Sequence, residues 1–154
     1  GEPEEVRLAA VEALGLLGPV AQTQSEAVAR ALRDPNPHVC ARALEALRRL
    51  GVASAPYSAA LLGDGDRYVR TRAAAALGRL GAGAIDHVGA VAALLADANE
   101  HQDVRGAALQ ALTRIVGEDA PLAIAGAFDA ARCLKREAEE PAGSKKAMRL
   151  WPGR

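Results

Sequence analysis

The chain has 154 residues, with 19 basic and 19 acidic side chains, and half of its residues are hydrophobic although only 3% are aromatic. This length fits a single domain. No run of about 18 consecutive apolar residues occurs, so we expect the chain to have no transmembrane segment of its own. Alanine and leucine dominate the hydrophobic residues, a composition typical of closely packed helices.

The first predicted helix runs from Val6 to Gly18, and its pattern returns three times along the chain. The later copies are Val39 to Gly51, Val69 to Gly81 and Val104 to Val116. Each copy has valine at its start, alanine at +4, Ala-Leu at +7 and +8, and leucine or isoleucine at +11. These offsets lie on one side of a helix, so each copy predicts an amphipathic helix. Similarity at a fixed period is typical of a repeat array.

A less regular helix is expected before each of the last three copies, at Ser25 to Asp34, Tyr57 to Asp64 and Asp86 to Asp97. Turn-forming residues follow each of these helices. Glycines at 18, 51 and 81 are expected to end the second helices in the left-handed conformation. The unit is therefore a helix, a tight polar turn and a second helix. Because no first helix precedes the Val6 helix, we expect the first unit to be incomplete and the chain to be a fragment, a processed product or part of something longer.

The residues that recur in these units resemble a known family. They are Asp34, Pro35, Val39, Arg42, Ala43, Ala46, Leu47, Leu50 and Gly51; Asp64, Val69, Arg70, Ala73, Ala76, Leu77, Leu80 and Gly81; and Val6, Arg7, Ala10, Ala13, Leu14, Leu17 and Gly18. This pattern is similar to the short HEAT-like repeats named after phycobilin lyases. The resemblance covers roughly residues 3 to 117 and implies an all-α fold, an α-solenoid of about four stacked antiparallel helix pairs.

The fourth copy departs from the pattern, because two extra residues separate Asp97 from Val104 and the closing glycine is one place late, at Gly117. We therefore expect a bulged turn or a tilted helix there. The repeats start 33, 30 and 35 residues apart, a spacing that tetratricopeptide and ankyrin arrays share. The sequence motifs of those two arrays are missing, so they remain alternatives on spacing alone.

Charged residues at the unit junctions are expected to be structural. The resemblance implies that an inter-repeat ladder of hydrogen bonds ties successive units together, made by Asp34, Asp64, Asp97, Arg7, Arg70 and Arg105. Cysteine stands at position 40 where this pattern has arginine, and we expect Arg42 to reach into its place.

A second set of arginines offers a candidate partner-binding surface. Arginine occupies offset +10 in three copies and offset +3 in two, at Arg49, Arg79, Arg114, Arg42 and Arg72. The resemblance implies that the second helices line a concave face, where this stripe would meet an acidic segment or a phosphate. Glu45 precedes Arg49 by four residues and is expected to pair with it.

The end of the chain differs in character. We divide the sequence into a repeat array at 1–118, a C-terminal capping helix at 119–140 and an extended basic tail at 141–154. The tail has four positive charges and no negative one, and it contains the only tryptophan. Aromatic anchors with basic neighbours are common in segments that dock on a partner. Lys145, Lys146, Arg149 and Trp151 are therefore further candidate partner-binding residues, although a terminus without fixed structure is the simpler alternative.

Catalytic chemistry has little support in the sequence. His38, His87 and His101 show no recurring ligand spacing, so we expect no metal site, and we identify neither catalytic nor cofactor-binding residues. Two isolated cysteines, Cys40 and Cys133, favour buried reduced thiols and a reducing compartment such as the cytosol or an organelle matrix.

These observations favour a non-catalytic scaffold that binds other protein subunits through the second-helix face, the tail or both, as a structural subunit or fragment of a larger assembly. Two alternatives stay open. The repeat type by itself suggests a chromophore-handling protein similar to bilin lyases. The arginine stripe suggests phosphate or nucleic-acid binding, which we consider the less favoured partner class.

Overall fold

A computed structural model describes residues 1–117 together with Ala125. The regular secondary structure of these residues is entirely helical, without a β-strand. The longer helices are α1 (Glu4–Leu17), α3 (Pro37–Leu50), α5 (Arg67–Leu80) and α7 (Gln102–Val116). The shorter helices are α2 (Ser25–Arg30), α4 (Ala55–Ala60) and α6 (Val88–Ala96), and 3₁₀ turns occupy Gly18–Gln24, Ala31–Arg33, Val52–Ser54, Leu61–Gly63 and Gly81–His87. Apart from Ala125, the expected capping helix at 119–140 and the basic tail lie outside the described residues.

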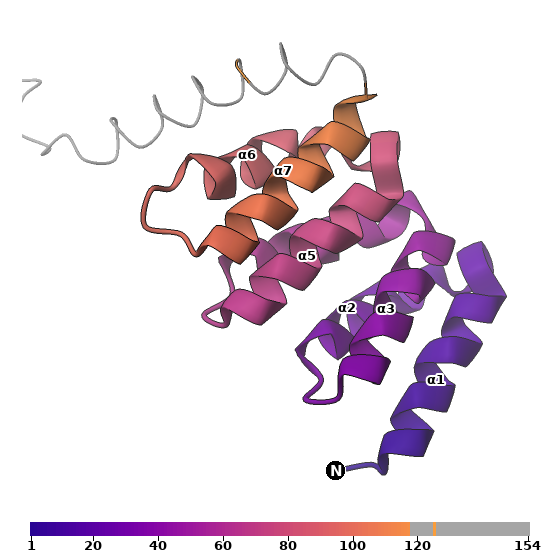
Figure 1. Cartoon of the computed structure of the whole chain (residues 1–154). Coiled ribbons are helices and arrows are strands. Elements are labelled where there is room, and N and C mark those ends of the chain that lie inside the picture. The colour runs from indigo at the N-terminus through magenta and orange to yellow at the C-terminus, as the bar shows by residue number, and fades with distance from the viewer. Residues whose placement is uncertain (118–124, 126–154) are drawn as a thin grey trace, which may run out of the picture.

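The four longer helices lie side by side in chain order, α1 against α3, α3 against α5, and α5 against α7 (Figure 1). Each shorter helix packs on the longer helix that follows it, α2 on α3, α4 on α5 and α6 on α7. Among the described residues, α1 is thus followed by three successive pairs of a shorter and a longer helix.

The repeated apolar offsets form the core of the last three units. The valines that start the pattern, Val39, Val69 and Val104, are at most 3% exposed. The leucines at +8, Leu47, Leu77 and Leu112, are fully buried, as are the alanines at +4. Burying a leucine stabilises the fold by roughly 1.5–3 kcal/mol, so this stripe holds each longer helix against its neighbours.

Glycine ends every longer helix, but not in the left-handed helical conformation that the sequence suggested. Gly18, Gly51, Gly81 and Gly117 have φ between 56° and 80°, with ψ between −135° and −157°. Positive φ with an extended ψ is a region that only glycine occupies readily. After α1, α3 and α5 the chain can therefore leave the helix abruptly and turn into the next 3₁₀ segment.

The described part of the chain also has a longer period. The segment Val6–His38 is identical to the segment 63 residues later at 16 of 33 positions. Its backbone repeats too, since Gly18 and Gly81 share φ 56° and ψ −135°, and each begins a seven-residue 3₁₀ segment. The segment that contains α1 therefore corresponds to the segment that contains α5. The correspondence shifts by two residues at the next copy, since Val39 matches Val104 and not Gln102.

Glycine also sets how closely neighbouring helices approach. A Cβ on Gly15 in α1 would lie 3.0 Å from the Cα of Ala46 in α3, and a Cβ on Gly78 in α5 would lie 2.9 Å from the Cα of Ala111 in α7. The corresponding position in α3 is Arg48, which is exposed. The backbones of α1 and α3, and those of α5 and α7, thus approach each other closely at a glycine. The α3–α5 pair has no such glycine, because α3 has Arg48 at this position.

One helical stretch, Arg67–Ala96, meets length and hydropathy criteria for a membrane span, with a mean hydropathy of 1.3 in its best window. It comprises α5, a 3₁₀ segment and α6, and Gly81 and Ala84 inside it have non-helical dihedral angles. Core helices of soluble proteins pass the same test.

Candidate binding surface

The turns between the helices of each unit share one local structure. The carboxylates of Asp34, Asp64 and Asp97 accept a hydrogen bond from the backbone N–H two residues later, at 2.9 to 3.0 Å. Such a bond closes an Asx turn. Asn36 and Asp66 then accept from the first turns of α3 and α5 at 2.7 and 2.8 Å, and so cap these helices.

An arginine from the preceding unit reaches each of these turns. Arg7 donates two hydrogen bonds to Asp34, at 2.7 and 3.0 Å. Arg33 meets Asp64 at 2.6 Å, and Arg70 donates two bonds to Glu100, at 2.7 and 2.8 Å. The hydrogen bonds from arginine lower the pKa of Asp34 and of Glu100, while the pKa of Asp64 is lowered first by the Asp66 N–H and then by Arg33.

Two of the junctions differ from the expected ladder, since Arg33 was not expected at Asp64 and Glu100 was not expected beside Arg70. Arg70 binds Glu100, which lies three residues after Asp97 in the turn that has two extra residues. Arg105 remains within its own unit, where it donates to the Leu95 carbonyl at 3.3 Å.

The cysteine at position 40 is accommodated in an unexpected way. Arg42 does not reach into its place, since its guanidinium lies 3.8 Å from Glu12 of α1. Arg72, from the following unit, instead donates to the Leu32 carbonyl at 2.9 Å. The Cys40 thiol is buried and lies 3.1 Å from the Asp34 carbonyl oxygen, and burial raises its pKa. Arg72 therefore belongs with the junction residues and is only partly exposed.

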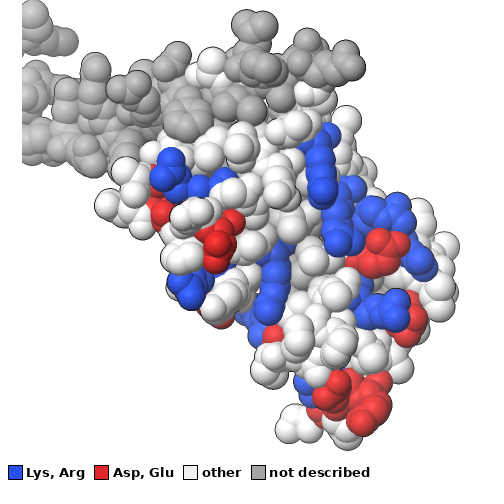
Figure 2. All heavy atoms as spheres, viewed as in Figure 1, with Lys and Arg blue, Asp and Glu red and all other residues white. Residues whose placement is uncertain are grey.

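The other four arginines of the stripe are exposed on α3, α5 and α7. Three of them lie near carboxylates: Arg42 beside Glu12, Arg49 2.9 Å from Glu45, and Arg79 3.8 Å from the same Glu45. Arg114 has no ion pair with any residue of the described part of the chain. Figure 2 shows basic side chains, all of them arginines in the described part of the chain, gathered along this face with acidic groups between them.

Glu45 is the centre of this surface. It also accepts two hydrogen bonds from Arg48, at 2.7 and 3.1 Å, so three guanidinium groups surround one carboxylate. Hydrogen bonds from Arg48 and Arg49 lower the pKa of Glu45 to about 2. Three positive charges less one negative charge leave an excess of two at this point.

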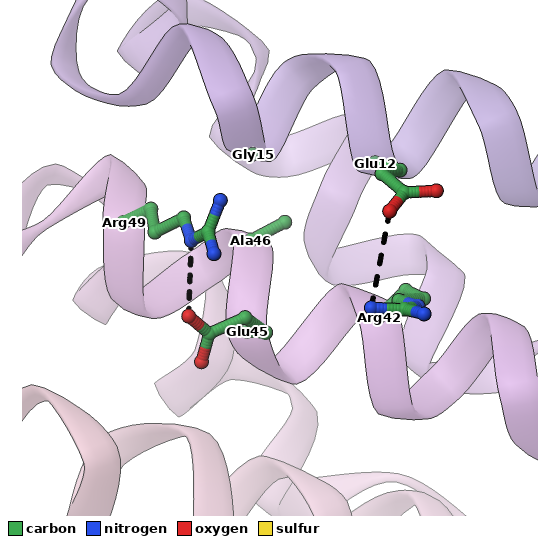
Figure 3. Close-up of a pocket in the computed structure, with 6 residues that line it drawn as sticks. All are labelled: Glu12, Gly15, Arg42, Glu45, Ala46 and Arg49. Carbon is green, nitrogen blue, oxygen red and sulfur yellow. Dashed lines mark hydrogen bonds and ion pairs between the residues drawn. The ribbon is translucent and has the colours of Figure 1, made fainter.

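A shallow pocket between α1 and α3 adjoins the cluster (Figure 3). It is lined by Glu12, Gly15, Arg42, Glu45, Ala46 and Arg49. The close contact of Gly15 with Ala46 forms its floor, and the Arg42–Glu12 and Arg49–Glu45 pairs stand at its two sides. The pocket therefore presents charged groups above a small apolar floor.

A second groove, between α2 and α4, lies on the shorter helices and includes Tyr57. Its arginines are paired one to one, Arg30 with Glu26 at 2.6 Å and Arg33 with Asp64. This groove has no excess of charge, so we regard the face of α3, α5 and α7 as the stronger candidate for binding.

Residues with catalytic or metal-binding potential are dispersed in this structure. His101 is the N-cap of α7 and accepts from the Asp103 N–H at 3.2 Å. Among residues 1–117, no three His, Cys, Asp or Glu side chains are grouped to hold a metal ion. Cys133 and the tail candidates Lys145, Lys146, Arg149 and Trp151 lie outside the described residues.

Sequence reasoning missed three residues of these networks. Arg33 and Glu100 complete two junctions, and Arg48 completes the cluster at Glu45. The spacing of Arg48 from Glu45, three residues on one helix face, could have indicated this contact. No comparable local signal existed for Arg33 and Glu100, whose partners lie 31 and 30 residues away.

No protein-family model and no curated protein matches this chain.

Proposed function

We propose that this chain is a non-catalytic scaffold that binds an acidic segment of another protein across α3, α5 and α7. In this proposal the helix pairs continue one another as an α-solenoid of about four HEAT-like units, the first of them incomplete. The chain would serve as a structural subunit or fragment of a larger assembly.

The arrangement at Glu45 carries the proposal. The Glu45 carboxylate lies among Arg48, Arg49 and Arg79, and this supports the proposal that the same guanidinium groups can bind a carboxylate from a partner. Guanidinium groups bind carboxylates in a bidentate manner and stay charged, so the excess of two positive charges favours an acidic ligand. Arg114 extends the same row to α7 at the equivalent offset.

The test measures binding of a fluorescent glutamate-rich peptide by anisotropy, with the intact chain. Replacing Arg49, Arg79 and Arg114 by glutamate should weaken binding by at least about tenfold, because each attraction becomes a repulsion. The control replaces Arg30, Arg67 and Arg105 by glutamate. It changes the net charge of the chain by the same amount, but at other offsets of the repeat, and should retain most of the affinity for the peptide. Circular dichroism of both triple variants verifies that the helices are retained.

Equal losses in the two triple variants would mean that only net charge matters, which contradicts the proposed surface. A labelled oligonucleotide serves as the competing probe: tight, salt-sensitive binding of this probe without peptide binding would favour the nucleic-acid alternative. A chain ending at Glu140 tests the tail, and reduced peptide affinity in that chain would assign part of the binding to Lys145, Lys146, Arg149 and Trp151.

A further inference from the structure

Helix α1 carries the core pattern of the repeat but leaves most of it exposed; of this pattern, Leu14 at offset +8 is partly buried against the core. Val6 is 50% exposed, whereas its counterparts Val39, Val69 and Val104 are at most 3% exposed. At offset +11, Leu17 is 57% exposed, while Leu50 at the same offset is 2% exposed. Ala10 and Ala13 are exposed as well, and Leu16 is 71% exposed.

These exposed residues form one continuous face. Offsets 0, +4, +7 and +11 lie on one side of the helix, and Leu16 extends that side. The opposite side, with Val11 and Gly15, is buried and packs on α3. We name the exposed side the α1 face; it consists of Val6, Ala10, Ala13, Leu16 and Leu17 and contains no charged residue.

The rest of the chain indicates what such a face contacts. In α3, α5 and α7 the same offsets are covered by two helices each, the longer helix of the preceding unit and the shorter helix of the same unit. By the 63-residue correspondence α1 is equivalent to α5, and α5 packs against α3 and α4. The matching cover for the α1 face is therefore a helix pair like α3–α4.

The charges beside the α1 face agree with this. Glu2, Glu4 and Glu5 are exposed at the start of α1, and their carboxylates form no ion pair within the described part of the chain. At the start of the other longer helices, Asp34, Asp64 and Glu100 are each bound by an arginine from the preceding unit. A covering unit that carries an equivalent arginine would complete the series.

We propose that the α1 face is a docking surface for a partner helix pair of this same repeat type, with an alanine- and leucine-rich contact side and an arginine directed at the acidic start of α1. This goes beyond the arginine surface of α3, α5 and α7, because it uses the other side of the first helix and an apolar contact. The two surfaces can be occupied together.

The test supplies such a helix pair directly. A second copy of residues 34–63, which contain α3 and α4, is fused before Gly1. In the original chain Gly63 is followed by Asp64, and Gly1 corresponds to Asp64 because the two are 63 residues apart. In the fused chain Gly63 of the copy is followed by Gly1. The copy is therefore joined to α1 in the same register in which α3 and α4 precede α5. Hydrogen exchange of the α1 amides should slow by about tenfold or more in the fused chain relative to the original chain, because covered helices open less often.

Leu17→Asp in the fused chain should abolish this slowing, since it places a charge within the apolar contact. Ile85→Asp is the matched control, because Ile85 is similarly exposed, at 53%, but lies in the 3₁₀ segment after α5. Equal α1 exchange in the fused and original chains would overturn the proposal. So would a dimer of the original chain in sedimentation velocity that Leu17→Asp converts to monomer, because the occupant would then be a second copy.

Discussion

The close approach of α5 to α7 at Gly78 leads to the sharpest prediction about this fold. The change is Gly78→Ala. A Cβ added at this position would lie 2.9 Å from the Cα of Ala111 and 3.2 Å from its Cβ. Contacts this short with a neighbouring backbone force the two helices apart, so we expect the variant to be less stable than its helix propensity implies.

The magnitude follows from two opposing effects. Replacing glycine by alanine inside a helix stabilises it by roughly 0.5–1 kcal/mol. Overpacking a filled contact costs about 1–3 kcal/mol. Gly106→Ala isolates the first effect. Gly106 is in α7, and apart from the backbone of its own helix and its chain neighbours, no described atom lies within 4 Å of a Cβ added there. The difference between the two variants is then the overpacking cost by itself, about 1–3 kcal/mol.

Urea unfolding followed by far-UV circular dichroism measures both variants against the original chain. We expect Gly106→Ala to raise the midpoint and Gly78→Ala to lower it or leave it unchanged. Gly15→Ala, where the added Cβ would lie 3.0 Å from Ala46, should behave like Gly78→Ala. Equal stabilisation by Gly78→Ala and Gly106→Ala would refute the idea that glycine sets the distance between these helices.

Three further predictions concern charged and thiol groups. Arg48 and Arg49 lower the folded-state pKa of Glu45 to about 2 from an ordinary value of 4.5, so the stabilisation from ionised Glu45 should be complete above about pH 4.5 and decline as the pH falls toward 2. The free energy of unfolding of Glu45→Gln should therefore depend less on pH across that range. Identical pH profiles of the variant and the original chain would contradict this. Asp34→Ala removes a largely buried carboxylate and leaves Arg7 unpaired, so urea unfolding should show a loss of about 1–3 kcal/mol, and no loss would argue against a structural junction. In a Cys133→Ser chain, Cys40 should react with a thiol reagent much more slowly when folded than in denaturant, and rapid reaction of the folded chain would contradict its burial.

The candidate surface could be predicted only in part from the sequence. Arg49, Arg79 and Arg114 recur at one offset, so their common helix face followed from helical periodicity. Their surroundings did not, because Arg79 approaches Glu45 from another helix, 34 residues away along the chain (79 − 45). Arg72 is at offset +3, as Arg42 is, but its guanidinium donates to the Leu32 carbonyl. This contact depends on how two units pack.

The sequence by itself determined the four longer helices and their C-terminal ends, but not the bounds of the shorter helices: Tyr57 to Asp64 was expected, whereas α4 is Ala55–Ala60. Apolar offsets at 0, +4, +7, +8 and +11 define a buried side within one helix, and a glycine after each longer helix permits the positive φ that ends it; both are local properties. Only the tertiary structure decided which arginine meets which carboxylate and which apolar sides are covered. Val6 and Val39 begin the same pattern, yet one is half exposed and the other fully buried. The physical reason is that burial depends on neighbouring helices, and the pattern of a single helix does not specify which neighbours it has.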